Sequence, residues 1–172
     1  VITDGCQQAL YLALKKITQP GDSVAIESPV YYGLLQILDG LQLKAVEIPV
    51  HPRDGIHLPT LQDSLQRLPI KACWFMSSFH NPLGASMSDE KKQALYDLLM
   101  QHQVPLIEDD VYAELYFGAA PPKPVKFFDR AGLVMHCGSF SKNLAPGYRV
   151  GWVSAGRYAE QIHRLKLMTT IS

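Results

Sequence analysis

The chain has 172 residues, and 47% of them are apolar, so its length and composition predict one globular domain with a sizeable core. Sixteen lysines and arginines balance sixteen aspartates and glutamates, and only 19% of the residues are charged, which argues against disorder. A chain with zero net charge has no overall field that would attract a polyanion, so nucleic-acid binding by this chain itself is not expected.

Helical and strand-like segments alternate along the chain. In chain order, the apolar patterns predict a strand at 1–3, a helix at 7–18, a strand at 24–27, a helix at 31–41, a strand at 44–49, a helix at 58–68, a strand at 72–76, a helix at 88–102, and strands at 104–108, 133–137 and 150–154. This alternation predicts a three-layer α/β/α domain in which helices cover both faces of a mainly parallel, seven-stranded sheet.

Neither end of the chain carries a terminal signal. Position 1 is not methionine, and the helix-like stretch 165–172 ends without a glycine or proline stop. We therefore expect residues 1–172 to form one domain of a longer protein.

Missing motifs disfavour several classes of function. No apolar run approaches the roughly 18 residues of a membrane span, and no secretory signal is visible, so we expect a cytoplasmic protein without membrane contact. Cys6, Cys73 and Cys137 include no CxxC pair, which argues against a disulfide scaffold and a structural zinc site. The chain also has no P-loop, no dinucleotide fingerprint, no zinc-hydrolase spacing and no G-x-S-x-G nucleophile elbow.

Polar residues gather in the loops that follow the predicted strands, where ligands bind in parallel α/β sheets. Gly5, Cys6 and Gln7 open a helix whose free N–H groups and dipole favour an anion such as phosphate, although an ordinary glycine turn has the same pattern. Tyr31 offers a ring that could stack on a flat ligand or simply pack in the core. Asn81 could bind a ligand or only begin an Asn-Pro turn.

Two later loops carry ionisable groups. Ser139 and Ser141 supply hydroxyls, and Arg149 supplies a guanidinium, which suit phosphate oxygens. Lys142 lies in the same loop; in an apolar setting a lysine can have a lowered pKa that frees its amine for Schiff-base chemistry, and the alternative is a solvated lysine. In the acidic run 108–110, one carboxylate could hold a proton on a ring nitrogen, or the run could be a helix cap or a solvated turn.

These features together match one cofactor, pyridoxal 5′-phosphate (PLP), which needs a phosphate clamp, a reactive lysine and an acid partner for its ring nitrogen. The chain resembles fold-type I, class I and II aminotransferases over its whole length. The motifs that carry the resemblance are S-x-S-K-x-x-x-P-G-x-R-x-G-W at 139–152, E-D-D-x-Y at 108–112, N-P-x-G at 81–84 and G-x-Q-Q-A-L at 5–10. The most similar groups are the aminotransferase-like domains of MocR-type regulators of the GntR family and the kynurenine/2-aminoadipate aminotransferases.

The resemblance implies a role for each candidate residue. Lys142 would react with the cofactor aldehyde and later move a proton at the substrate α-carbon, and Asp109 would keep the ring nitrogen protonated. Tyr112 and Asn81 would hydrogen-bond the 3-oxygen of the ring, and Tyr31 would stack on it. The phosphate site would comprise Cys6, Gln7, Ser139, Ser141 and Arg149, with Gly5 permitting the close turn. Cys6 stands where relatives often have serine, so a hydroxyl contact would be lost and an N–H contact kept.

Two functions remain open on this resemblance. The first is the PLP-binding effector domain of a MocR-type transcription regulator, in which PLP and an amino-group ligand act as a switch; the local sequence favours it. The second is a free-standing aminotransferase that transfers an amino group between an amino acid and a 2-oxo acid. A third possibility is a degenerate domain that binds no cofactor. It is disfavoured because the residues implied to hold PLP are all present: Lys142, Asp109, Tyr112, Asn81 and Arg149.

The resemblance also implies parts outside residues 1–172. The full-length protein would be a homodimer, and DNA would be bound only through a separate N-terminal winged-helix domain. The α-carboxylate of an amino-acid substrate would be held by an arginine of a smaller C-terminal domain. We therefore do not expect residues 1–172 alone to be an active aminotransferase.

Overall fold

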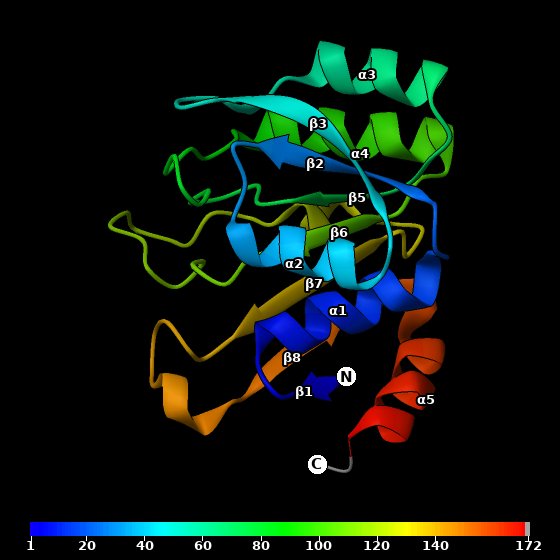
Figure 1. Ribbon diagram of the computed structural model, residues 1–172. Helices are drawn as coiled ribbons and strands as arrows, with labels where there is room; N and C mark the ends of the chain where they lie inside the picture. The colour runs from blue at the N-terminus through cyan, green and yellow to red at the C-terminus, as the bar shows by residue number, and fades with distance from the viewer. Residues whose placement is uncertain (171–172) are drawn as a thin grey trace.

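One mixed sheet runs through the middle of the molecule (Figure 1), and the computed structural model describes residues 1–170. Its strands are β1 (Ile2–Thr3), β2 (Ser23–Ser28), β3 (Lys44–His51), β4 (Gly55–Ile56), β5 (Ile70–Phe75), β6 (Leu106–Asp109), β7 (Val134–Ser139) and β8 (Gly151–Ser154). Their order in the sheet is β1-β8-β7-β6-β5-β2-β3-β4. The block from β7 through β6, β5 and β2 to β3 is parallel, whereas the pairs β7–β8, β8–β1 and β3–β4 are antiparallel.

Helices cover both faces of this sheet. One face carries α1 (Cys6–Ile17), α2 (Tyr32–Gly40) and α5 (Ala159–Thr169), and the other carries α3 (Leu58–Arg67) and α4 (Asp89–His102). Three short 3-10 helices complete the described part: η1 (Val125–Phe128), η2 (Pro146–Tyr148) and η3 (Gly156–Tyr158).

The two faces form separate hydrophobic cores because successive side chains of a strand point to opposite sides of the sheet. In β6 and β7, Ile107 and Met135 pack in the core under α1, whereas Leu106 and Val134 pack in the core under α3 and α4. The same alternation decides which of the acids at the end of β6 lies on the α1 side.

The predicted three-layer α/β/α architecture with a mainly parallel sheet is confirmed. The seven predicted strands and four predicted helices are present, and their ends differ from the prediction by at most two residues. The sheet has one strand more than predicted: the two residues of β4 lie in a turn-rich stretch where no strand was expected. Of the helix-like stretch predicted at 165–172, residues 165–169 form the end of α5 and Thr170 is its extended C-cap; positions 171–172 lie outside the described residues.

The first turn of α1 has no side-chain cap, and the same holds for α2 and α5 on this face of the sheet. Ser88 caps α4 by accepting a hydrogen bond from the Lys91 N–H at 3.2 Å, but no side chain caps the start of α1, where Gly5 has φ = 90°. The first N–H groups of an uncapped helix lack intrahelical partners and favour an anion. The apolar side of α1, which includes Ala9 and Leu10, holds this turn against the sheet.

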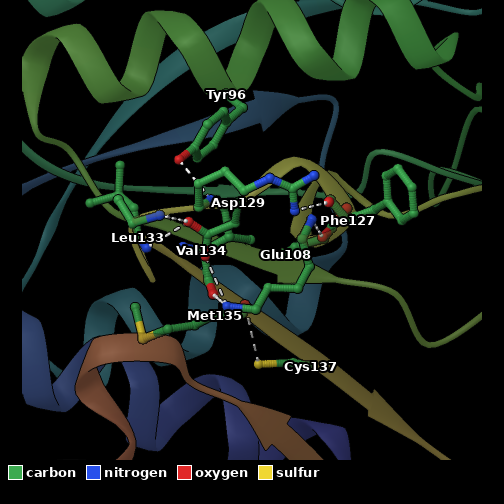
Figure 2. A network of polar contacts seen from close by, with 11 residues as sticks. Tyr96, Glu108, Phe127, Asp129, Leu133, Val134, Met135 and Cys137 are labelled. Carbon is green, nitrogen blue, oxygen red and sulfur yellow. Dashed lines mark hydrogen bonds and ion pairs between the residues drawn. The ribbon is translucent and has the colours of Figure 1, made fainter.

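A polar network joins η1 to the neighbouring strands β6 and β7 (Figure 2). The Asp129 carboxylate accepts hydrogen bonds from the N–H groups of Leu133 and Val134, both at 3.0 Å, and from the Lys126 ammonium at 2.9 Å. Glu108, near the end of β6, accepts one from the Lys126 N–H at 3.0 Å. The network fixes the carboxyl-terminal half of β6 beside β7.

All three cysteines are buried free thiols. Within residues 1–170, no helix combines the length and the apolar character that crossing a membrane requires.

Candidate active site

A cavity of about 190 Å³ opens at the carboxyl-terminal ends of the parallel strands, beside the first turn of α1. Ten of the eleven predicted site residues line it: Cys6, Gln7, Tyr31, Asn81, Asp109, Tyr112, Ser139, Ser141, Lys142 and Arg149. The eleventh, Gly5, immediately precedes the lining residue Cys6. These residues come from five separate loops or strand ends, and the parallel sheet brings them to one edge.

Of the three successive acids at the end of β6, only Asp109 lines the cavity. Because strand side chains alternate, Glu108 lies on the α3 and α4 side, where the Ser77 hydroxyl donates a hydrogen bond to it at 2.6 Å. Asp110, beyond the strand, pairs with Nε2 of His136 at 2.9 Å. The structure therefore narrows the predicted acid partner to Asp109.

Asp109 is a buried acid with 4% of its surface exposed. Burial raises its pKa from 3.8 to about 6, and hydrogen bonds from the Cys6 thiol and the Val111 N–H offset part of that rise. The Cys6 thiol donates to Oδ1 at 3.5 Å. A buried carboxylate in this setting favours a cationic ligand group, such as a protonated ring nitrogen, because the opposite charge offsets the cost of ionising the acid.

Lys142 lies at the mouth of the cavity. Its side chain is exposed, and its Nζ lies 5.9 Å from the centre of the Tyr112 ring. Of the two settings considered for Lys142, apolar and solvated, the structure shows the solvated one, because the irregular segment after β7 carries the residue to the surface. Asn81 Nδ2 donates a hydrogen bond to the Tyr112 hydroxyl at 3.4 Å, so the two residues predicted to bind the same ring oxygen are already neighbours.

The predicted anion-binding residues surround the uncapped turn of α1. Arg149 Nη1 donates to the Ser141 hydroxyl at 3.1 Å, and Nη2 donates to the Asp4 carbonyl at 2.9 Å. Ser139 Oγ accepts a hydrogen bond from the Ser141 N–H at 3.4 Å. A guanidinium, two hydroxyls and free helix N–H groups are the donors that phosphate oxygens prefer.

Gly5 is the residue that lets the guanidinium approach α1. Its φ of 90° belongs to the region that side chains disfavour, and a Cβ there would collide with Arg149 Nη2. Both facts explain why glycine stands at this position.

We expect Gly5→Ala to lower the free energy of unfolding by about 1–3 kcal/mol through backbone strain and to weaken phosphate binding, because Arg149 must move. Gly21→Ala is the matched control: Gly21 has φ = 92°, but no atom lies within 4 Å of the added Cβ. Urea unfolding and phosphate titration of both variants separate strain from collision. Equal losses of phosphate affinity in the two variants would contradict the role given to Gly5.

Two side chains of the first α1 turn do not face an anion. Cys6 directs its thiol to Asp109, so any contact of Cys6 with an anion must come from its N–H. Gln7 Nε2 donates to the Gly33 carbonyl at 3.4 Å, which ties α1 to α2. Gly33 also makes room for the ring of Tyr31, since a Cβ at Gly33 would collide with Tyr31 Cε1.

Three apolar lining residues were missed by the sequence analysis: Leu10, Met76 and Val111. Each stands next to a predicted residue or element. Leu10 lies one helical turn after Cys6, Met76 follows the last residue of β5, and Val111 directly precedes Tyr112. Proximity to a predicted site residue was the only signal in the sequence for these three residues. It does not distinguish an apolar residue that lines the cavity from one that packs in the core.

Among the described residues 1–170, the donor set fits PLP: a phosphate cradle without a competing side-chain cap, a buried acid without a lysine or arginine partner, and a lysine at the open side. A mainly parallel α/β sheet with helices on both faces is the architecture of fold-type I aminotransferase-like proteins. The chain belongs to the aminotransferase class I and II family, whose model matches residues 1–170.

Similar proteins include both regulators and enzymes. The chain is 51% identical over 172 residues to the uncharacterized HTH-type transcriptional regulator YdcR of Escherichia coli K12, covering 100% of this chain and 37% of that protein. It is 35% identical over 158 residues to aromatic-amino-acid aminotransferase 1 of Thermococcus litoralis, covering 89% and 38%. The chain thus spans less than two fifths of these two relatives.

Solved structures share the fold. The kynurenine aminotransferase of Pyrococcus horikoshii matches with a TM-score of 0.89 and 32% identity, over 98% of this chain and 42% of that one. LysN, the alpha-aminoadipate aminotransferase of Thermus thermophilus, matches with a TM-score of 0.90 and 31% identity over 97% and 44%; it was solved with N-(5′-phosphopyridoxyl)-L-leucine. The predicted family, its fold and its cofactor class are confirmed.

Proposed function

We propose that residues 1–172 are the PLP-binding domain of a MocR-type transcription regulator, and that PLP together with an amino-acid ligand acts as its effector. One observation supports the PLP-binding part of the proposal: the cavity at the carboxyl edge of the sheet gathers a phosphate cradle, a buried acid and a lysine. A site that bound only an anion would not need a buried carboxylate. A site that only transferred protons would not need a phosphate cradle.

When bound, PLP supplies a reactive aldehyde and an electron-accepting ring. In the proposed arrangement Lys142 would supply the amine that bonds the cofactor and that carries a proton at the reacting carbon. Asp109 would keep the ring nitrogen protonated. Asn81 and Tyr112 would hydrogen-bond the 3-oxygen of the ring, and Tyr31 would stack on the ring. The phosphate would be held by the Arg149 guanidinium, the hydroxyls of Ser139 and Ser141, and the N–H groups of Cys6 and Gln7.

The regulator is favoured over an enzyme by the similarity to YdcR, which at 51% identity extends over the whole chain. A neutral chain has no field for DNA, so on this proposal DNA is bound by another part of the full-length protein. We further propose a homodimer in the cytoplasm that binds an amino acid or a 2-oxo acid.

A free-standing aminotransferase is the second candidate, and the 35% identity to the Thermococcus litoralis enzyme supports it. Both candidates use the same residues around PLP, so the cavity does not distinguish between them. The full reading frame would distinguish the two candidates. In the regulator, a basic winged-helix segment of roughly 70 residues, within the size of a small domain, would precede Val1.

The proposal is tested with the full-length gene product. We expect it to bind PLP, with a visible absorption band, and to bind DNA from its own upstream region with an affinity that changes when a specific amino acid is added. The readouts are an absorption titration and fluorescence anisotropy with labelled DNA, across a panel of amino acids. Sustained multiple-turnover transamination without DNA binding would favour the enzyme instead, and failure to bind PLP would contradict both candidates.

A further inference from the structure

The acid that faces the cavity has a thiol partner. Cys6 is the first residue of α1 and Asp109 is the last residue of β6, and the two are 103 positions apart in the sequence. Both are buried, with 7% and 4% of their surfaces exposed, and the Cys6 thiol donates a hydrogen bond to Asp109 Oδ1 at 3.5 Å. In the folded chain, the Cys6 side chain therefore connects the first turn of α1, where the phosphate would bind, to the acid Asp109.

Burial of a thiol does not by itself produce such a contact, because the other two cysteines are also buried. Cys137 stands directly opposite Asp109 in the register of β6 and β7. Its thiol nevertheless donates to the Met135 carbonyl at 4.0 Å (Figure 2) and not to the acid. Cys73 packs in the core on the opposite face of the sheet. The contact between Cys6 and Asp109 is specific to the first turn of α1.

The thiol is suited to this position for a chemical reason. A thiol is a weak donor, so it can orient a carboxylate without satisfying all of its hydrogen-bonding capacity. A hydrogen bond donated to a carboxylate favours the ionised form. Asp109 also accepts a hydrogen bond from the Val111 N–H, and the lone pairs that remain on the carboxylate can accept one from a protonated ring nitrogen.

We infer that Cys6 is a positioning residue for Asp109: its thiol holds one carboxylate oxygen, so that the other meets the ring nitrogen of PLP. The inference rests on the proposed PLP function. Cys6 contributes to both ends of the cofactor, with its N–H near the phosphate and its side chain behind the acid. This arrangement differs from the role expected from the sequence, which placed Cys6 at the phosphate only.

The test compares two ligands in the full-length protein: PLP and its 1-deaza analogue, in which a C–H group replaces the ring nitrogen. The analogue keeps the phosphate and the aldehyde but removes the atom that Asp109 would hold. The measured quantity is the ratio of the two affinities, from absorption titrations. Because stacking, phosphate binding and overall stability affect both ligands alike, the ratio reports on the acid and the ring nitrogen.

We expect Cys6→Ala to reduce the preference for PLP over the analogue by about threefold to tenfold, the range of one hydrogen bond to a charged group made by a weak donor. Cys6→Ser keeps a donor at the same position and should retain most of the preference. Cys137→Ala, with Cys73→Ala as a second control, should leave the ratio within about twofold of the wild type, the level expected when no hydrogen bond to Asp109 is lost.

Each other result contradicts the inference. An unchanged ratio in Cys6→Ala would show that the thiol does not act on the acid, and equal loss of both ligands would assign Cys6 to packing or to the phosphate alone. A loss in Cys6→Ser as large as in Cys6→Ala would exclude a donor role. Wild-type protein that binds neither ligand would overturn the proposed function itself, so the two failures are distinguishable.

Discussion

Replacing Lys142 with alanine in the full-length protein is expected to remove the covalent link to PLP while leaving the phosphate cradle in place. The adduct that borohydride traps on the chain should disappear, and the visible band of bound PLP should move to that of the free aldehyde. Any transamination half-reaction should fall by on the order of 10²- to 10⁴-fold, because the variant also lacks the amine that moves the proton. Absorption spectra, mass spectrometry after reduction and single-turnover kinetics measure these three effects.

Lys15→Ala is the matched control for Lys142→Ala, since Lys15 is an exposed lysine in the last turn of α1, at the end of the helix remote from the cavity. Its spectrum and its trapped adduct should equal those of the wild type. A Lys142→Ala protein that still yields a reduced adduct in the peptide containing residue 142 or elsewhere in the site would exclude Lys142 as the reacting amine.

Asp109→Asn is expected to separate binding of PLP from its chemistry. The amide preserves the size of the side chain but cannot carry the charge that holds a proton on the ring nitrogen. We expect PLP to remain bound through its phosphate, and the half-reaction with an amino acid to slow by on the order of 10²- to 10³-fold, the cost of losing one charged stabilising group. Stopped-flow absorption of the loaded protein measures the rate. A near-normal rate in this variant would contradict the role proposed for Asp109.

The same substitution should have a pH-dependent effect on stability when PLP is absent. The folded protein raises the pKa of Asp109 from 3.8 to about 6 because the carboxyl is buried. A carboxyl that binds its proton more tightly in the folded state makes unfolding easier as pH rises through this window. Between about pH 4 and pH 7, Asp109→Asn should therefore gain stability relative to the wild type, by up to about 3 kcal/mol at roughly 1.36 kcal/mol per pKa unit.

Urea unfolding of the PLP-free protein at several pH values measures this difference. Asp39→Asn removes an exposed carboxylate from the end of α2 and serves as the control. Its difference from the wild type should remain small across the same range, as for most exposed substitutions. An Asp109→Asn protein whose relative stability does not change with pH would show that the acid is not buried in the folded protein.

The local pattern of apolar residues was enough to predict most of the helices and strands. Apolar runs of strand length and helically spaced apolar residues gave seven strands and four helices to within two residues at their ends, because each buried face imposes its own period. The strand β4 was not predicted, because its pairing with the end of β3 across a tight turn is a tertiary contact that its own two residues do not indicate. Polar residues after successive strands also located the cavity, because parallel strands bring their carboxyl ends to one edge.

The sequence by itself determined the order of the elements, the edge of the sheet that carries the chemistry and the residue types available there. Only the tertiary structure decided which of three adjacent acids faces the cavity, that Lys142 lies exposed at its mouth, and that the thiol of Cys6 contacts Asp109. The physical reason is that these are relations between residues far apart in the chain. The alternation of β6 and the placement of α1 against it fix them, and no local period encodes a contact across 103 positions.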